Sequence, residues 1–383
     1  MVPNGWNTKP LADIVKEKIS YGIVQAGPHV PDGIPYIKSS DVRGTINPDA
    51  LQRTSQEIHF KYRRSSVHPG DIVFSLRGNI GESAIVPASL PEANLTQGTA
   101  RISVSVEHSN LFHYYQLASE KILNRVNALS KGSTFKEISL EELRKVKVLC
   151  APLPEQKKIA QILSTWDEAI TTTEQLLANS QQQKKALMQQ LLTGKKRLMD
   201  KNGVRFSGEW NHGHLSDLGK ITKGKALSSK DLIDGDYPVI AGGKSSPYNH
   251  RDYTHENVIT VSASGAYAGY VAYHPYKLWA SDCSVVMGKP NSNIGFIYQL
   301  MSHMQSKIYS LQSGGAQPHV YPKDLEVLRV SIPPIGEQQK IAAVLSTADQ
   351  EISALQQKLD ALKQEKKALM QQLLTGKRRV KIH

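Results

Sequence analysis

The chain has 383 residues, of which 39% are hydrophobic and 21% are charged. This is an ordinary globular composition of two or three domains, and it excludes a disordered chain and a membrane protein. The formal net charge of +13 makes a polyanion the first partner to consider, with nucleic acid ahead of a membrane surface.

Cysteine content and the start of the chain indicate the compartment. Cys150 and Cys283 are the only cysteines, too few for a disulfide framework or a cysteine-rich zinc site. The first residues, Met-Val-Pro-Asn-Gly-Trp, lack the basic start and apolar stretch of a secretion signal. No apolar run approaches the ~20 residues that a membrane helix needs. We therefore expect a cytoplasmic protein without a bound metal.

The first predicted domain covers residues 1–151 and mixes short strands, helix and polar loops. Residues 71–74 and 100–106 have strand patterns, and residues 111–129 have a helical pattern. The loops between them suit close approach to phosphates and hydrogen bonding to base edges. Taken singly, each such loop is more often an ordinary turn. The candidate DNA-contacting residues are Lys38, Ser39, Arg43, Ser75, Arg77, Asn79, Lys131, Ser133 and Lys136.

The segment of residues 152–194 is predicted to contain one long helix of about 38 residues, or about 55 Å at ~1.5 Å per residue. Spacings alternate between three and four along its seam, as in a coiled coil. Two prolines lie at its start, and Gly194 follows it, where a left-handed C-cap is expected. The apolar seam residues are Ile159, Leu163, Trp166, Ile170, Leu177, Leu187 and Leu191.

A basic linker, residues 195–202, leads into a second mixed domain at residues 203–333. Strand patterns lie at 258–261 and 283–287, and a helical pattern at 294–311. Polar, glycine-rich loops again separate them. The candidate DNA-contacting residues are Lys223, Lys225, Lys244, Ser245, Ser262, Ser264, Tyr267, Gln317 and His319.

A second long helix is predicted at residues 334–376, followed by a basic tail at 377–383. Residues 337–379 match residues 155–197 without a gap, with 26 identities in 43 positions. The seam residues of this helix are Ile341, Leu345, Ile352, Leu355, Leu359, Leu362, Leu369 and Leu373. The chain is therefore a duplication of one large module.

The two domains repeat more faintly than the helices. Trp6-Asn7 recurs as Trp210-Asn211, and Tyr115-Gln-Leu recurs as Tyr298-Gln-Leu. Near-identical helices indicate a shared role, whereas divergent domains indicate one scaffold with two different recognition tasks. The basic runs at 195–197 and 377–379 could contact phosphate or solvate the helix ends.

Connectivity predicts how the helices pair. The second helix can pair with the first only by running back, so we expect an antiparallel pair with one domain at each end. A symmetric register places Lys184 opposite Ala348 and Lys366 opposite Trp166, where an indole face attracts an ammonium. The alternative is two amphipathic helices, each packed on its own domain.

Catalytic motifs are incomplete in this sequence. The run from Gly219 to Ala226 resembles a P-loop, but Ala226 replaces the hydroxyl residue that binds magnesium. Ile332-Pro-Pro-Ile335 lacks the polar and aromatic residues of an adenine methyltransferase loop. His212-Gly-His214 has no further metal ligands nearby in the sequence. We therefore predict no catalytic residue and no metal ligand.

The doubled pattern resembles the specificity subunit of type I restriction–modification systems over essentially the whole chain. The resemblance rests on Pro-x-x-Glu-Gln-Lys-Lys-Ile-Ala at 152–160 with its copy at 334–342, on both Gln-Gln-Leu-Leu-Thr-Gly helix ends, and on the domain starts at Gly5-Trp6 and Glu209-Trp210. It implies an α+β protein in which a long antiparallel two-helix coiled coil separates two target recognition domains.

The resemblance also implies a function. Each domain would read one half of a split DNA site, and the helices would set the spacing and dock two adenine methyltransferase subunits. ATP-dependent restriction subunits would join outside. S-adenosylmethionine, ATP and magnesium would belong to those partners, and this chain would bind no cofactor. Three other hypotheses remain: an autonomous enzyme, a coiled-coil scaffold, and a DNA-reading adaptor of another methylation-based defence system.

Overall fold

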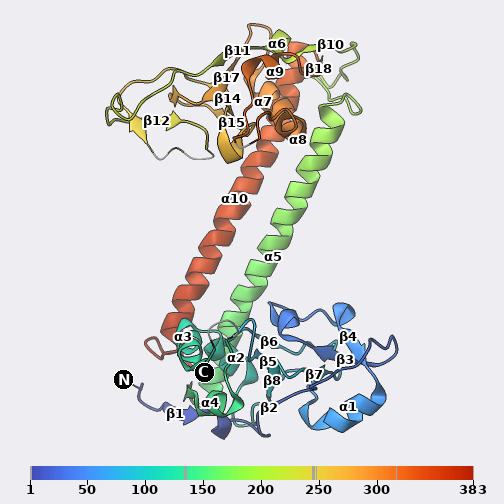
Figure 1. Cartoon of the computed structure of the whole chain (residues 1–383), viewed down its shortest axis with the longest axis vertical. Helices are drawn as coiled ribbons and strands as arrows, with labels where there is room; N and C mark the ends of the chain where they lie inside the picture. Colours follow the sequence, from blue (N-terminus) through green and yellow to red (C-terminus); the bar gives the residue numbers. More distant parts are fainter. Residues whose placement is uncertain (1, 133–135, 244–245, 247, 316, 383) are drawn as a thin grey trace. The chain divides into compact units, whose positions relative to one another are not determined.

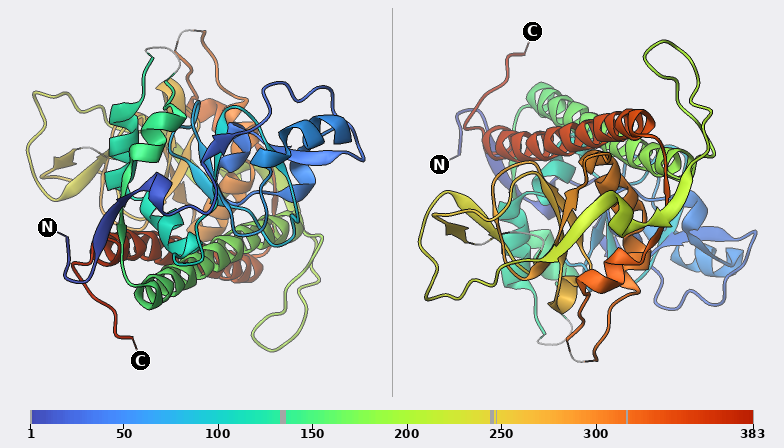
Figure 2. Two further views of the ribbon diagram at one scale, coloured as in Figure 1. Left: turned by 90° about the horizontal axis from the view of Figure 1, so that it is seen from below. Right: turned by 90° about the horizontal axis from the view of Figure 1, so that it is seen from above.

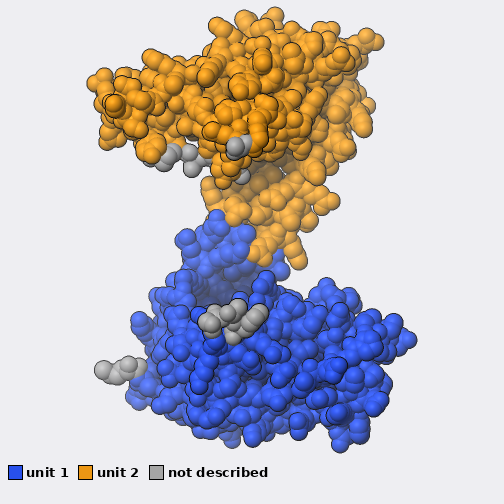
Figure 3. Space-filling model, in the orientation of Figure 1, with its two compact units in different colours: residues 1–172, 359–383 blue, residues 173–358 orange. Residues whose placement is uncertain are grey.

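The computed structural model describes residues 2–132, 136–243, 246, 248–315 and 317–382 (Figure 1). The chain forms two compact units (Figure 3). Unit 1 comprises residues 1–172 and 359–383, and unit 2 comprises residues 173–358. Each unit therefore contains one recognition domain and part of each long helix. The two divisions, after residue 172 and after residue 358, fall inside the two predicted helical segments.

The described residues of unit 1 form three small sheets. The largest has the order β2-β8-β5-β6, the second has the order β4-β3-β7, and β1 pairs with β9. The strands are β1 Asn7–Pro10, β2 Ser20–Tyr21, β3 Ile34–Ile37, β4 Gln52–Thr54, β5 Ile72–Ser75, β6 Ser83–Ile85, β7 Asn94–Leu95, β8 Thr99–Ile102 and β9 Lys147–Cys150.

The helices of unit 1 are short except for the parts of the two long ones. They are α1 Gln56–Tyr62, α2 Asn110–Leu117, α3 Glu120–Leu129 and α4 Leu140–Lys145, with 3-10 turns at Leu11–Asp13, Ser39–Val42, Pro48–Ala50 and Arg63–Ser65. The single helix predicted at 111–129 is two helices, because the chain becomes extended at Ser119, the N-cap of α3.

The largest sheet of unit 1 is buried on both faces. Ile72 and Phe74 of β5 pack into a core with residues of α3 and α4, whereas Val73 points into a second core with residues of β3 and β7. Alternate strand residues face opposite sides, so a fully buried strand requires apolar residues at consecutive positions. This explains the unbroken apolar run of β5.

Unit 2 repeats this arrangement. Its sheets have the orders β11-β17-β14-β15, β13-β12-β16 and β10-β18. The strands are β10 Asn211–His214, β11 Gly219–Lys223, β12 Tyr237–Ile240, β13 Asn249–His250, β14 Val258–Ser262, β15 Val271–His274, β16 Trp279–Ala280, β17 Cys283–Gly288 and β18 Arg329–Ile332. The short helices are α6 Leu215–Leu218, α7 Ile294–His303, α8 Gln305–Tyr309 and α9 Pro322–Glu326, with a 3-10 turn at Gly265–Tyr267.

The long helices are α5 Leu153–Leu191 and α10 Ile335–Leu373, each of 39 residues. Gly194 and Gly376 follow them with φ of 72° and 66°, the left-handed conformation expected of the C-caps. The seam residues on both helices are all buried or half-buried. The predicted fold class, two mixed domains with two long helices, is confirmed.

Within each unit the two long helices lie side by side and antiparallel (Figure 1; Figure 2). In unit 1, Lys366 Nζ forms an ion pair with Asp167 and lies 5.2 Å from the centre of the Tyr115 ring. In unit 2, Lys184 Nζ forms an ion pair with Asp349. The lysine partners are thus the carboxylates that directly follow Trp166 and Ala348 in sequence.

Candidate nucleic-acid interface

Most of the described candidate residues of unit 1 gather around one loop, residues 75–81. Arg43 donates from Nη2 to Asn79 Oδ1 over 2.7 Å, and Asn79 Nδ2 donates to the Ser39 carbonyl over 3.2 Å. Arg43, Asn79 and Lys136 line a hollow of about 350 Å³. Arg77 and Lys131 each form a backbone bridge with Glu137. Residues separated by up to 98 positions therefore present one surface.

The corresponding loop of unit 2 is residues 262–269. Ser264 and Ser313 both form backbone bridges with His319. Ser264 Oγ also donates to Asp282, and the His319 ring stacks on Tyr321 with an interplanar angle of 13°. Tyr267 and Gln317 are exposed beside them in sequence. Hydroxyl, imidazole and phenol groups thus take the place of the guanidinium and ammonium groups of unit 1.

The backbone of the two loops is nearly the same. Gly78 and Gly265 have φ of 76° and 77°, and Gly81 and Gly269 have φ of 89° and 88°. Leu76 N–H donates to the Gly98 carbonyl, and the Leu76 carbonyl accepts from Ile138 N–H. Ala263 N–H donates to the Asp282 carbonyl in the same way, and the Ala263 carbonyl accepts from Val320 N–H. Arg77 therefore corresponds to Ser264, and Glu137 corresponds to His319.

Some candidate residues lie elsewhere. Ser75 and Ser262 are buried, with exposed fractions of 0% and 3%, because both end central strands. Their hydroxyls donate within the loops instead, to the Arg77 and Ser264 carbonyls.

The candidate lysines outside the loops have other surroundings. Lys38 donates to Gln52, and Lys225 lies 5.1 Å from the Trp279 ring. Lys223 is exposed at the end of β11. Ser133, Lys244 and Ser245 lie outside the described residues.

The basic runs after the helices have a structural role that the sequence left open. Arg379 donates from Nε and Nη2 to both oxygens of Glu155, at 2.6 and 2.8 Å, and Trp6 Nε1 donates to Glu155 Oε2 at 3.0 Å. Glu155 is 1% exposed. A buried carboxylate needs such charged and hydrogen-bonding partners.

Unit 2 contains the same clamp. Arg197 donates to both oxygens of Glu337 at 2.7 Å, and Trp210 Nε1 donates at 2.9 Å. Each clamp joins the end of one long helix to the start of the other and to the start of a recognition domain. The ion pairs raise the pKa of Arg197 and Arg379 above the ordinary arginine value. The repeated Trp, Glu and Arg were visible in the sequence, but their pairing was not.

The neighbouring glutamines fix the first short helix of each domain. Gln156 Oε1 accepts from Ser109 N–H over 2.8 Å, and Gln338 Oε1 accepts from Asn293 N–H over 2.9 Å. Ser109 and Asn293 are the N-caps of α2 and α7. The repeated Glu-Gln pair therefore ties each long helix to its recognition domain.

Alignment on these caps corrects one feature of the predicted repeat. Tyr115 corresponds to Gln299, not to Tyr298, because Tyr115 Oη donates to Asp167 and Gln299 Nε2 donates to Asp349. The repeated Tyr-Gln-Leu letters are offset by one position, since α7 begins one residue later relative to this motif.

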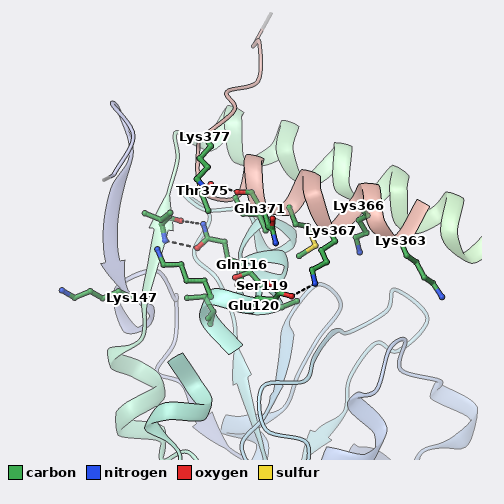
Figure 4. A pocket seen from close by; sticks show the side chains of 16 residues that line it. Gln116, Ser119, Glu120, Lys147, Lys363, Lys366, Lys367, Gln371, Thr375 and Lys377 are labelled. Carbon is green, nitrogen blue, oxygen red and sulfur yellow. Dashed lines mark hydrogen bonds and ion pairs between the residues drawn. The ribbon is translucent and has the colours of Figure 1, made fainter. Parts of the chain in front are cut away.

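Each unit also has a groove beside the end of a long helix. In unit 1 a groove of about 540 Å³ lies between α10, α2–α3 and β9 (Figure 4). Met370 and Leu374 provide apolar surface, Lys121 and Lys147 are exposed along it, and Lys367 pairs with Glu120 at 2.6 Å. A groove of about 710 Å³ in unit 2 is lined by Leu192 and Thr193, which directly follow α5, by α7–α8 and β18, and by His212 and His214 of β10.

Comparison with known proteins decides the family. The type I restriction modification DNA specificity domain matches the chain twice, at residues 3–179 and 207–364. The chain belongs to this family. The recognition domains and long helices described above are therefore those of a type I restriction–modification specificity subunit.

Individual relatives agree with this assignment. The MjaX putative specificity subunit of Methanocaldococcus jannaschii is 26% identical over 99% of this chain and 95% of its own length. The EcoBI specificity subunit of Escherichia coli is 28% identical over 42% of this chain and 35% of its own length.

Solved structures share the fold. The crystal structure of the type I restriction–modification S subunit from M. genitalium covers 97% of both chains with a TM-score of 0.70 and 17% identity. A chain from a structural study of complex assembly in the type I system gives a TM-score of 0.55 at 16% identity. In the part of the chain that the structure describes, no helix is long and apolar enough to cross a membrane.

Proposed function

We propose that this chain reads a split DNA site, one half with each recognition domain, and has no catalytic activity of its own. The observation that carries the proposal is the shared loop frame with different side chains. Arg77 can donate a bidentate pair of hydrogen bonds to guanine, whereas the Ser264 hydroxyl at the same backbone position already donates to Asp282 and can only accept from a base. Two copies of one frame with different chemistry suit two different half-sites.

Charge supports DNA as the ligand. The chain has a net charge of +13, and Arg43, Arg77, Lys131 and Lys136 are exposed on the loop surface of unit 1. Contacts to phosphates would position the duplex, and contacts to base edges would supply sequence preference.

The test is selection of bound duplexes from a library with both half-sites and the spacer randomised. We expect a split consensus. Arg77→Ala should weaken the preference at one half only, and Ser264→Ala should do so at the other half. A folded variant that changes both halves equally contradicts the modular assignment, and the absence of any selected sequence favours a scaffold without a DNA role.

We further propose that the two grooves dock methyltransferase subunits, one in each unit. Both are formed by matching elements, which suits two copies of one partner. The apolar Met370 and Leu374 beside exposed lysines favour an amphipathic helix with acidic flanks. The ATP-dependent restriction subunits would join this assembly, and S-adenosylmethionine, ATP and magnesium would serve the partners.

The groove assignment is tested by mass measurement of the assembled complex. Lys121→Glu combined with Lys147→Glu alters unit 1 alone, so one methyltransferase copy should be lost while the second stays bound. A complex that keeps both copies contradicts the assignment of the groove in unit 1. The purified chain without partners should neither methylate nor cut DNA, and methyl transfer by it would favour an autonomous enzyme.

A further inference from the structure

One group of side chains in unit 1 has the composition of a metal site. His108, His113 and Cys150 each offer one ligand atom, and these three atoms lie within 4.8 Å of one another. We propose that the group binds one zinc-class divalent ion. Neither the histidine pattern nor the cysteine count predicted it, because the ligands come from separate elements.

Two elements of unit 1 bring the ligands together. His108 directly precedes Ser109, the N-cap of α2, and His113 lies within α2. Cys150 is the last residue of β9, three positions before the first residue of α5. The bond from Ser109 N–H to Gln156 fixes the start of α2 against α5. A bound ion would therefore cross-link the recognition domain at the point where it joins the long helix.

The histidine spacing suits a tetrahedral ion. His113 Nε2 lies 3.4 Å from His108 Nδ1. Zinc–nitrogen bonds of ~2.0–2.1 Å in tetrahedral geometry separate two ligand nitrogens by about 3.4 Å. Two imidazoles and a sulfur are donors that zinc accepts, whereas magnesium and calcium take oxygen ligands. Water would take the fourth position, and His108 Nδ1 would exchange its contact with Gln156 Nε2, 3.2 Å away, for the ion.

The sulfur changes state when the ion binds. Cys150 would bind as the thiolate, and its thiol proton would pass to solvent. His108 is half-buried and leaves a route for the ion.

Unit 2 shows that the fold does not require these residues. Cap alignment places Ile297 at the position of His113, and both are 0% exposed. Cys150 pairs with Asn7 in β1, as Ile332 pairs with Asn211 in β10. The same backbone therefore packs apolar side chains in unit 2 and ligand side chains in unit 1, which provides matched control substitutions.

The first experiment uses the tag-free full chain with Cys283→Ala, so that Cys150 is the only thiol. Cobalt(II) should produce a thiolate-to-cobalt charge-transfer band that saturates at one equivalent per chain and disappears when zinc is added. Absence of this band overturns the proposal without requiring any substitution at the site.

The second experiment measures zinc affinity by competition with a chromophoric chelator. His113→Ile and Cys150→Ile introduce the residues of unit 2 and should each weaken binding by more than about tenfold. His212→Ala, in the other histidine pair, should leave the affinity unchanged. Equal zinc affinity in the wild type and both isoleucine variants would show that the ion binds elsewhere.

Discussion

The two recognition domains share a backbone and differ in the chemistry that it presents. Both have a four-stranded, a three-stranded and a two-stranded sheet in matching order. The loops at residues 75–81 and 262–269 share glycines at matching positive φ. Yet Arg77 and Glu137 in unit 1 correspond to Ser264 and His319 in unit 2. Duplication thus preserved the sheets and the loop backbone, and it varied the side chains that the loops expose.

The connecting parts vary much less. Each clamp uses Trp, Glu and Arg at corresponding positions. In each Glu-Gln pair, the Glu accepts from the clamp and the Gln accepts from the N-cap of a short helix. A buried carboxylate tolerates little change, because loss of its partner leaves an uncompensated charge. An exposed loop side chain can change at a small cost in stability. This difference in energetic constraint explains why the helices repeat closely and the domains do not.

The largest expected effect comes from lengthening both helices. Insertion of seven residues after Leu177 and after Leu355 keeps the heptad phase and adds about 10 Å at ~1.5 Å per residue. If α5 and α10 set the half-site spacing, as the family resemblance implies, the preferred spacer should grow by about three base pairs while both half-sites stay the same.

The measurement is selection from a library with fixed half-sites and a variable spacer. Affinity should also fall, since three base pairs rotate the far half-site by about 100° at ~10 base pairs per turn. Insertion of four residues disrupts the seam phase and is the control. An unchanged spacer in a folded, binding variant would mean that the helices do not determine it.

The clamps should differ in their contribution to stability. Arg197→Ala leaves Glu337 buried without its ion pair and should lower the free energy of unfolding by about 2–3 kcal/mol. Arg379→Ala should have a smaller effect, because its side chain is 45% exposed, compared with 20% for Arg197, and water screens the pair. Urea denaturation measures both.

Lys196→Ala is the matched control for the clamp, since this neighbouring side chain is exposed. Its stability should stay near that of the wild type. Equal losses for Arg197→Ala and Arg379→Ala would show that exposure does not control the strength of the clamp.

The salt dependence of DNA binding should separate the two loops. Lys131→Ala removes an exposed charge from the loop surface of unit 1 and should reduce the log–log salt slope by about 1. Ser264→Ala removes no charge and should leave the slope unchanged. Binding titrations between low and moderate salt measure this. A slope that is the same in both variants would place Lys131 away from the phosphates.

The smallest effect is expected at the contacts between α2 or α7 and the long helices. Tyr115→Phe removes one donor to Asp167, which keeps Lys366, and should cost about 1 kcal/mol. Gln299→Met should cost less, because Gln299 Oε1 is already buried without a partner. Thermal unfolding measures both. A larger loss in Gln299→Met would contradict this ranking.

Local patterns predicted most of the fold. The apolar runs at 71–74 and 258–261 became β5 and β14, and the heptad spacing predicted both long helices to within a few residues. The candidate loop residues around Asn79 also came together. The sequence could not predict that Ser75 and Ser262 are buried, because burial depends on the neighbouring strands and not on the residue type.

The sequence by itself determined the duplication, the long helices and their caps, since periodicity, proline and glycine act over short distances along the chain. Only the tertiary structure decided which charged residues meet. Arg379 and Glu155 are 224 positions apart, and His108 and Cys150 come from different elements. Such pairs depend on the path of the whole chain, so the local pattern around either residue does not specify its partner.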